Sequence, residues 1–117
     1  MNVLIAYDRC STCKRAEDFL KAQGVSFQKR PIKEENPTAK EIHEMRERSG
    51  LPLKRFFNTS GLKYRELGLK EKVPHLSAQE AADLLSTDGM LIKRPLLVQD
   101  NQILQIGYRK AYEELGL

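Results

Sequence analysis

The sequence contains no apolar run that approaches the roughly 20 residues needed to cross a lipid bilayer. Its N-terminus lacks the basic start, long apolar stretch and small-residue cleavage site of a secretory signal. Low hydrophobicity with one-sided charge, which is typical of disordered chains, is also absent, because 40% of the residues are hydrophobic. These absences predict a cytoplasmic globular protein with no membrane partner. At 117 residues the chain is expected to form a single domain over residues 1–117.

Histidine and cysteine are scarce, which limits the metal sites that the chain could build. The only histidines are His43 and His75, and the only cysteines are Cys10 and Cys13. A tetrahedral zinc site would need all four side chains, and the spacing of the histidines does not match a zinc finger. No glycine-rich phosphate loop is present either. We therefore expect no metal and no bound cofactor.

Charge of either sign does not concentrate in one segment. The chain carries 20 basic and 16 acidic residues, and 20 − 16 gives a net charge of +4. Four basic pairs are scattered among acidic residues: Lys14-Arg15, Lys54-Arg55, Lys93-Arg94 and Arg109-Lys110. A nucleic-acid-binding face usually gathers basic and aromatic side chains together, so no direct nucleic-acid partner is expected. The pairs are interpreted as solvated surface, with weak binding of anions or acidic partners as the alternative.

Hydrophobic periodicity at the N-terminus predicts a strand, a helix and a second strand. The apolar run 3–7 is typical of a buried strand, and the 3.6-residue pattern that begins at Ser11 and stops at Gly24 is typical of a helix. Alternation over residues 25–28, followed by Pro31 and Ile32, predicts the second strand. Strand, helix and strand within about 30 residues form a βαβ unit with a parallel pair.

The middle of the chain, approximately residues 37–89, is predicted to be a helical insertion packed on the core. A T-x-x-E capping box at Thr38 opens a helix that runs to about Arg48, and Gly50-Leu51-Pro52 stops it. A second box, from Ser77 to Glu80, opens a helix that Asp88-Gly89 is expected to end.

The C-terminal part returns to strands. Residues 94–98 and 103–106 are predicted strands, and the four residues Gln99 to Gln102 between them are short enough for a hairpin. A last amphipathic helix carrying Ala111, Tyr112 and Leu115 is expected after Gly107. The order βαβ, helical insertion, ββα is that of an α/β, thioredoxin-like fold with a four-stranded mixed sheet and a helical subdomain.

The cysteine pair carries the clearest chemical signal. A C-x-x-C motif beside a βαβ unit indicates thiol–disulfide chemistry. Cys10 lies at the helix start, where unpaired N–H groups and the helix dipole favour the attacking thiolate. Cys13, one turn later, is placed to resolve a mixed disulfide by attacking Cys10. Ser11 and Thr12 supply a polar loop between the cysteines, with ordinary helix-start residues as the alternative reading of both.

The cysteine pair has three other interpretations. An inert buried pair is possible, because free cysteine packs well in protein cores. A disulfide used only as a structural staple is poorly placed, since it would close too small a loop to stabilise the fold much. A phosphatase loop of the form C-x5-R would need arginine at position 16, where the chain has Ala16. That last reading is excluded.

Arg94-Pro95 is the second feature with a chemical interpretation. A proline at the start of a strand is tolerated for structural reasons alone. The alternative is a cis bond between Arg94 and Pro95 that approaches the cysteine loop. Arg94 would then lie beside the sulfur, where it could bind an oxyanion or stabilise the thiolate.

Four segments resemble the arsenate-reductase (ArsC) family, the group that includes Spx: CSTCKRA, FFNTSGLKYRELGL, DGMLIKRPLLV and IGYRKAYEELGL. They occur in family order along nearly the whole chain. The resemblance implies a thioredoxin-like fold with a helical insertion, Cys10 at the nucleophile position, and Arg94 before a cis Pro95 at an anion-binding position. It also implies a thiol oxidoreductase acting on a small thiol or oxyanion, with glutathione and glutaredoxin or thioredoxin as electron donors or redox partners.

The chain departs from two branches of that family. Glutaredoxin-linked arsenate reductases use three arginines, of which only Arg94 is retained here; Asn58 and Gly107 occupy the other two positions, and Arg55 or Arg109 could supply the missing charge. The Spx branch carries C-x-x-C as a redox switch and binds RNA polymerase through a glycine of the insertion. Here Pro52 occupies that position, and Gly50 lies two residues away. A redox-sensing regulator of Spx type that binds RNA polymerase is the alternative function.

Overall fold

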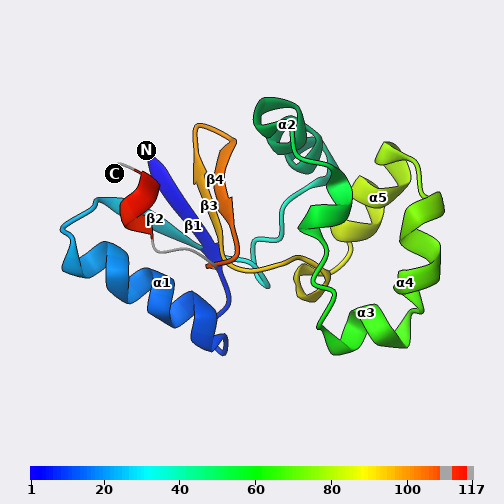
Figure 1. The fold of residues 1–117 in the computed structure, drawn as a ribbon, viewed down its shortest axis with the longest axis horizontal. Coiled ribbons are helices and arrows are strands. Elements are labelled where there is room, and N and C mark those ends of the chain that lie inside the picture. Colours follow the sequence, from blue (N-terminus) through cyan, green and yellow to red (C-terminus); the bar gives the residue numbers. More distant parts are fainter. Residues whose placement is uncertain (109–111, 116–117) are drawn as a thin grey trace.

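The computed structural model describes residues 1–108 and 112–115 of the chain. A four-stranded mixed sheet with the strand order β2-β1-β3-β4 occupies one end, with α1 on its outer side and a block of helices on the other side (Figure 1). The predicted order βαβ, helical insertion and ββ is confirmed. The final predicted helix appears in the described residues only as the 3-10 turn η4 (Tyr112–Leu115), and Ala111 lies outside them.

The N-terminal βαβ unit consists of β1 (Asn2–Ala6), α1 (Ser11–Ala22) and β2 (Phe27–Pro31), and the two strands pair in parallel. The second strand begins two residues later than the sequence pattern predicts. At the end of α1, the Val25 N–H donates to Leu20 O, and Gly24 adopts a left-handed φ of 67°. Because this closing turn uses the backbone of Val25, the strand starts only after it.

The helical insertion contains seven short elements: α2 (Ala39–Ser49), η1 (Leu53–Phe56), α3 (Leu62–Glu66), α4 (Leu69–Lys72), η2 (Val73–His75), α5 (Ala78–Leu85) and η3 (Gly89–Leu91). Both predicted capping boxes, at Thr38 and at Ser77, are confirmed. The predicted role of Asp88-Gly89 is wrong. Helix α5 already ends at Leu85, and the Asp88 side chain accepts a hydrogen bond from Met90 N–H, which opens η3 instead.

Strands β3 (Leu96–Gln99) and β4 (Gln102–Ile106) form the predicted hairpin, but its turn has two residues rather than four. Asp100 and Asn101 have φ values of 51° and 62°. Two consecutive left-handed residues are the geometry of a type I′ turn, which Asp and Asn tolerate better than most side chains. Gln99 and Gln102 are therefore paired strand residues.

The sheet separates two hydrophobic clusters, because alternate strand residues point to opposite faces. Leu4, Ala6 and Leu97 pack with α1 and Tyr112 on one face. Ile5, Leu96 and other residues of the opposite face join a cluster that continues into the insertion, where it includes Ile42 and Phe56. The insertion and the sheet thus share a continuous core.

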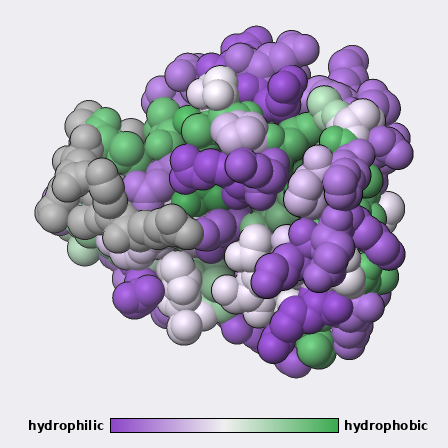
Figure 2. Space-filling model, turned by 45° about the vertical axis from the view of Figure 1, so that its right-hand side comes forward, coloured by the Kyte–Doolittle hydropathy of each residue, from purple (hydrophilic) through white to green (hydrophobic). Residues whose placement is uncertain are grey.

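The surface is predominantly hydrophilic on the face drawn in Figure 2, with hydrophobic side chains showing between the charged ones. Within residues 1–108 and 112–115, no helix has the length and apolar character needed to cross a membrane.

An ion pair joins the edge strand β2 to the start of the insertion. The Arg30 guanidinium donates two hydrogen bonds, of 2.7 and 3.0 Å, to the Glu41 carboxylate. Glu41 also accepts from the backbone N–H of Thr38 in the capping box. The bonds from Arg30, followed by that from Thr38, lower the pKa of Glu41 to about 2 despite partial burial. The charged form of Glu41 is therefore bound more strongly in the folded protein than in the unfolded chain.

We expect Glu41→Gln to lower the free energy of unfolding at pH 7 by about 1–2 kcal/mol, because it removes the charge and leaves Arg30 half-buried without its partner. The folded pKa of Glu41 lies below the unfolded value of 4.5. The contribution is therefore fully present above the unfolded pKa and is lost as the pH falls toward the folded one. Urea unfolding of both proteins at pH 7 and pH 3 measures the difference, which should shrink at pH 3.

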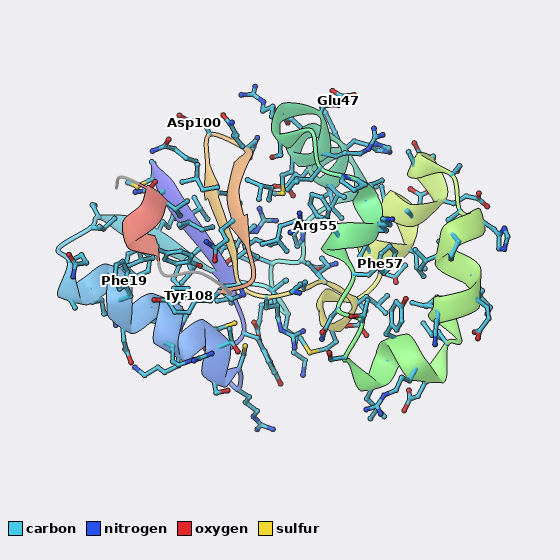
Figure 3. The ribbon with its side chains drawn as sticks, viewed as in Figure 1. Phe19, Glu47, Arg55, Phe57, Asp100 and Tyr108 are labelled. Carbon is cyan, nitrogen blue, oxygen red and sulfur yellow. The ribbon has the colours of Figure 1, made fainter. Side chains whose placement is uncertain are left out.

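Glu47→Gln is the matched control, because Glu47 lies on the same helix with its side chain exposed (Figure 3). It should change the free energy of unfolding by no more than a few tenths of a kcal/mol. An equal loss in the two variants, or a loss in Glu41→Gln that does not depend on pH, would contradict this account of the ion pair.

Candidate functional site

Cys10 is the residue that caps the N-terminus of α1. Its backbone is extended, with φ −107° and ψ 115°, and its Sγ accepts a hydrogen bond of 3.2 Å from the backbone N–H of Cys13. Its own N–H donates to Tyr7 O at 3.2 Å. Ser, Thr, Asp or Asn usually fills this capping position with an oxygen. Here a sulfur accepts one of the free N–H groups at the start of the helix.

Cys13 lies one turn further along α1 and is buried, with 2% of its surface exposed. Both cysteines are free thiols. Burial, together with a hydrogen bond to Cys10, raises the pKa of Cys13 to about 12, although Tyr7 and Arg94 act in the opposite direction. The pair is therefore asymmetric, with Cys10 partly accessible and Cys13 protonated behind it.

A cavity of about 350 Å³, the Cys10 hollow, opens beside the first cysteine. It is lined by Cys10, Thr12, Arg15, Asn58, Lys93, Arg94, Gly107 and Tyr108. Three of these side chains are cationic, and none of the described lining residues is acidic. Because no acidic side chain among these lining residues cancels the field of the three cations, the hollow favours an anionic ligand.

Arg94 is held in the wall of the hollow by several contacts. The bond between Arg94 and Pro95 is cis, which confirms the interpretation that placed a cis bond at this dipeptide. The guanidinium carbon lies 5.5 Å from the centre of the Tyr7 ring, and Nη1 donates to Gly89 O at 3.4 Å. Arg94 Nε is buried and has no hydrogen-bond partner within the described residues.

Backbone hydrogen bonds bring the distant segments of the hollow together. Lys93 N–H donates to Phe56 O, and Asn58 N–H donates to Leu91 O, both at 2.8 Å. A third bond of 2.8 Å runs from Gly107 N–H to Pro95 O. These main-chain contacts hold the segments around positions 58, 93 and 107 next to one another.

The six residues singled out in the sequence do not all reach the hollow. Cys10, Thr12 and Arg94 line it, and Pro95 is buried just behind the wall. Ser11 is exposed and lies outside the hollow. Cys13 lines a smaller cavity of about 120 Å³ on the other side of the loop, together with Glu17 and Lys29 among others.

Sequence analysis missed three lining residues: Arg15, Lys93 and Tyr108. Arg15 and Lys93 belong to basic pairs that were interpreted as solvated surface. For the pair Lys93-Arg94 that interpretation is wrong, because both residues are half-buried in the wall. Lys14, by contrast, pairs with Asp18 at 3.0 Å on the exposed side of the helix.

Of the two arginines proposed to supply the missing charge, the structure describes only Arg55. Arg55 is exposed on η1, close to Phe57 on the insertion side in Figure 3, and does not line the cavity. Arg109 lies outside the described residues. Tyr108 lies on the α1 side, where its ring centre is 6.4 Å from that of Phe19.

The surroundings of His43 and of the two cysteines bear on the alternative interpretations of the pair. His43 is paired with Gln79 in the insertion at 3.2 Å, and no group of three or more potential metal ligands occurs in the part of the chain that the structure describes. An inert pair would have both cysteines buried. Cys13 is buried, but Cys10 lines an open cavity.

Comparison with solved structures finds close similarity over the whole chain. A crystal structure of a possible arsenate reductase from Streptococcus mutans UA159 superposes with a TM-score of 0.95 at 52% identity, covering 100% of this chain and 98% of that one. A structure at this identity and coverage supports the architecture described above in full.

Sequence comparison points to the same group of proteins. The ArsC family model matches residues 6–114. The uncharacterized protein YusI of Bacillus subtilis is 46% identical over 109 residues, which are 92% of each chain. The regulatory protein MgsR of the same organism is 28% identical, covering 88% of this chain and 79% of MgsR. The global transcriptional regulator Spx of Lactiplantibacillus plantarum is 23% identical, covering 94% and 81%.

We expect iodoacetamide at pH 8 to modify Cys10 at least about a hundred times faster than Cys13 in the native protein, because Cys13 is buried and almost wholly protonated. Peptide mapping by mass spectrometry after timed quenching measures both rates. In urea, where burial is lost, the two rates should converge. Equal rates in the native state would contradict the asymmetry of the pair.

Proposed function

Because the chain belongs to the ArsC family, we propose that it is a thiol–disulfide oxidoreductase in which Cys10 attacks the substrate and Cys13 resolves the intermediate. The observation that carries the proposal is the capping geometry, in which Cys10 Sγ accepts the Cys13 N–H at the start of α1. An N–H donor and the positive end of a helix favour the anionic sulfur that attacks. The second thiol lies within one turn of the first.

The reaction consists of two exchange steps. In the first, the Cys10 thiolate attacks one sulfur of a substrate disulfide, so that a bond forms between the two sulfurs and the other substrate sulfur leaves as a thiolate. In the second, Cys13 loses its proton and attacks Cys10 Sγ, which releases the remaining substrate sulfur as a thiolate. The substrate gains two electrons, and the two cysteines become an intramolecular disulfide.

The raised pKa of Cys13 fits this order of events. Two of its causes, after burial, are the hydrogen bond and the charge interaction with Cys10. The charge interaction is removed once Cys10 is bound in a mixed disulfide, because the sulfur is then neutral, whereas the opposing influences of Tyr7 and Arg94 remain. Cys13 therefore becomes easier to deprotonate at the moment when it has to attack.

An external thiol must reduce the disulfide again to complete a cycle. Glutathione with glutaredoxin, or thioredoxin, would serve as the electron donor, so that a redox protein is the expected partner and no bound cofactor is needed. The cationic hollow and Thr12 would orient an anionic part of the substrate beside Cys10.

A narrower proposal is that the substrate at Cys10 is arsenate. Two of the three arginine positions of glutaredoxin-linked arsenate reductases hold Asn58 and Gly107 here, and both residues line the Cys10 hollow. A tetrahedral oxyanion gains most from paired guanidinium donors, and only Arg94 of that set remains. The geometry therefore supports a disulfide substrate more strongly than it supports arsenate.

A redox-sensing regulator of Spx type that binds RNA polymerase is the second candidate. The similarity to Spx and MgsR favours it, as does an open groove of about 430 Å³ on the insertion that includes Pro52, Leu53 and Lys54. Gly50 is used as the left-handed cap that ends α2, with φ 68°. Capture of the polymerase α subunit in either redox state would favour this candidate, and failure in both states would remove it.

The two-step mechanism predicts different products from two single-cysteine variants. With a neutral small disulfide, Cys13→Ser should accumulate a mixed disulfide on Cys10, whereas the wild-type protein should release both substrate halves and lose two hydrogen atoms. Cys10→Ser should form no adduct. Intact-mass analysis of acid-quenched samples distinguishes the three species.

A stable adduct on Cys10 of the wild-type protein would show that Cys13 does not resolve it. Reaction of Cys10→Ser at the wild-type rate would show that Cys10 is not the nucleophile. Thr59→Ser provides a matched control, because Thr59 is an exposed residue that does not line the hollow, and this variant should behave as wild type.

A further inference from the structure

Lys93 reaches across Gly107 inside the Cys10 hollow. A Cβ atom placed on Gly107 would lie 3.1 Å from Lys93 Cε and 3.9 Å from both Cδ and Cγ. The outer half of the lysine side chain therefore occupies the space in which any side chain at position 107 would begin. Gly107 also has a φ of 77°, which most other residues avoid.

The backbone fixes this arrangement from both sides. Lys93 N–H donates to Phe56 O, and Gly107 N–H donates to Pro95 O, each at 2.8 Å. Gly107 is itself buried, so the lysine stem packs against main chain, and Lys93 lines the cavity. The backbone at Gly107, directly after β4, thus supports the side chain of Lys93, which comes from the segment before β3.

We propose that Lys93, lying across Gly107, is an anion-binding residue of the Cys10 hollow, and that its ligand is a carboxylate or oxyanion group carried by the molecule that reacts with Cys10. The proposal rests on the proposed function for the reaction at Cys10 and names the chemical class of the substrate beside the reacting sulfur. A side chain at position 107 would crowd the end of Lys93, so the glycine leaves room for the lysine to lie along this wall of the hollow.

Charge and size together define the class of ligand. Lys93 joins Arg94 and Arg15 in a wall without an acidic residue among the described lining residues, and Asn58 adds a neutral amide. A lysine is a point charge on a flexible stem and does not require the planar, two-oxygen partner that suits arginine. A cavity of about 350 Å³ also has room for more than a single tetrahedral ion.

The test compares the rates at which an anionic and a neutral reagent alkylate Cys10. Iodoacetate and iodoacetamide react with the same thiolate, so the ratio of their rate constants cancels any change in the reactivity of the sulfur. At low ionic strength, Lys93→Gln should lower the iodoacetate-to-iodoacetamide ratio about threefold to tenfold, the effect of removing one charge at close range from a partly hydrated site. Lys93→Arg should keep most of the ratio.

Lys70→Gln is the matched control, since it removes the same charge from an exposed position on α4. It should leave the ratio unchanged, and added salt should weaken the wild-type preference. An unchanged ratio in Lys93→Gln, or an equal fall in Lys70→Gln, would overturn the proposal. Circular dichroism confirms that the variants are folded.

Protection experiments separate the two sources of the anion. Arsenate, or succinate as a dicarboxylate, is added at constant ionic strength while iodoacetamide modifies Cys10. Slowing of the reaction by either anion in wild type, and its loss in Lys93→Gln, supports the proposal and identifies the class of oxygen group. No protection by either anion overturns it.

Failure of this proposal is distinct from failure of the proposed function. Alkylation of Cys10 needs neither Cys13 nor a disulfide substrate. A protein with normal two-step exchange and no charge preference would refute only the role of Lys93. A protein with the charge preference and no resolution by Cys13 would refute only the two-cysteine mechanism.

Discussion

The site depends on a backbone contact between residues 56–58 and residues 91–95. Main-chain hydrogen bonds from Lys93 to Phe56 and from Asn58 to Leu91 form it, with an isolated antiparallel bridge between Phe57 and Ile92. It links the insertion directly to the segment that enters β3 and so brings Asn58 to the same cavity as Arg94. Because Phe56, Phe57, Leu91 and Ile92 are buried, water does not compete for these bonds.

Main-chain bonds of this kind do not depend on the identity of the side chains that they position. A different side chain at Asn58 would leave its backbone hydrogen bond to Leu91 in place. The backbone hydrogen bond of Lys93 to Phe56 is likewise independent of the lysine side chain. Side chains that line the Cys10 hollow can therefore differ while these backbone contacts stay as they are.

Much of the fold could be predicted from local signals. The strand periods, the capping boxes at Thr38 and Ser77 and the C-x-x-C motif at a helix start are encoded within a few residues, and the structure has all of them. Errors arose where one local signal has two meanings. Asp88 caps a turn that follows it instead of ending the helix before it, and Asp100-Asn101 form a tighter turn than the spacing indicated.

The site could be predicted only in part, because its remaining residues meet through long-range contacts. Cys10, Thr12 and Arg94 carry a motif or a resemblance, whereas Lys93 and Arg15 look like ordinary surface charge in the sequence. The position of Lys93 depends on the backbone contact with the insertion and on the absence of a side chain at Gly107. No periodicity or spacing pattern in the sequence predicts long-range contacts of this kind.

The chemistry of the site follows from an asymmetry between its two thiols, one capping a helix beside an open cavity and one buried behind it. The most direct test is the reduction potential of the Cys10–Cys13 pair, measured by equilibrating the protein in graded dithiol buffers and counting free thiols by mass. We predict a reversible two-electron couple between roughly −180 and −300 mV, within reach of cellular thiol pools. Failure to form an intramolecular disulfide at any potential would contradict the account.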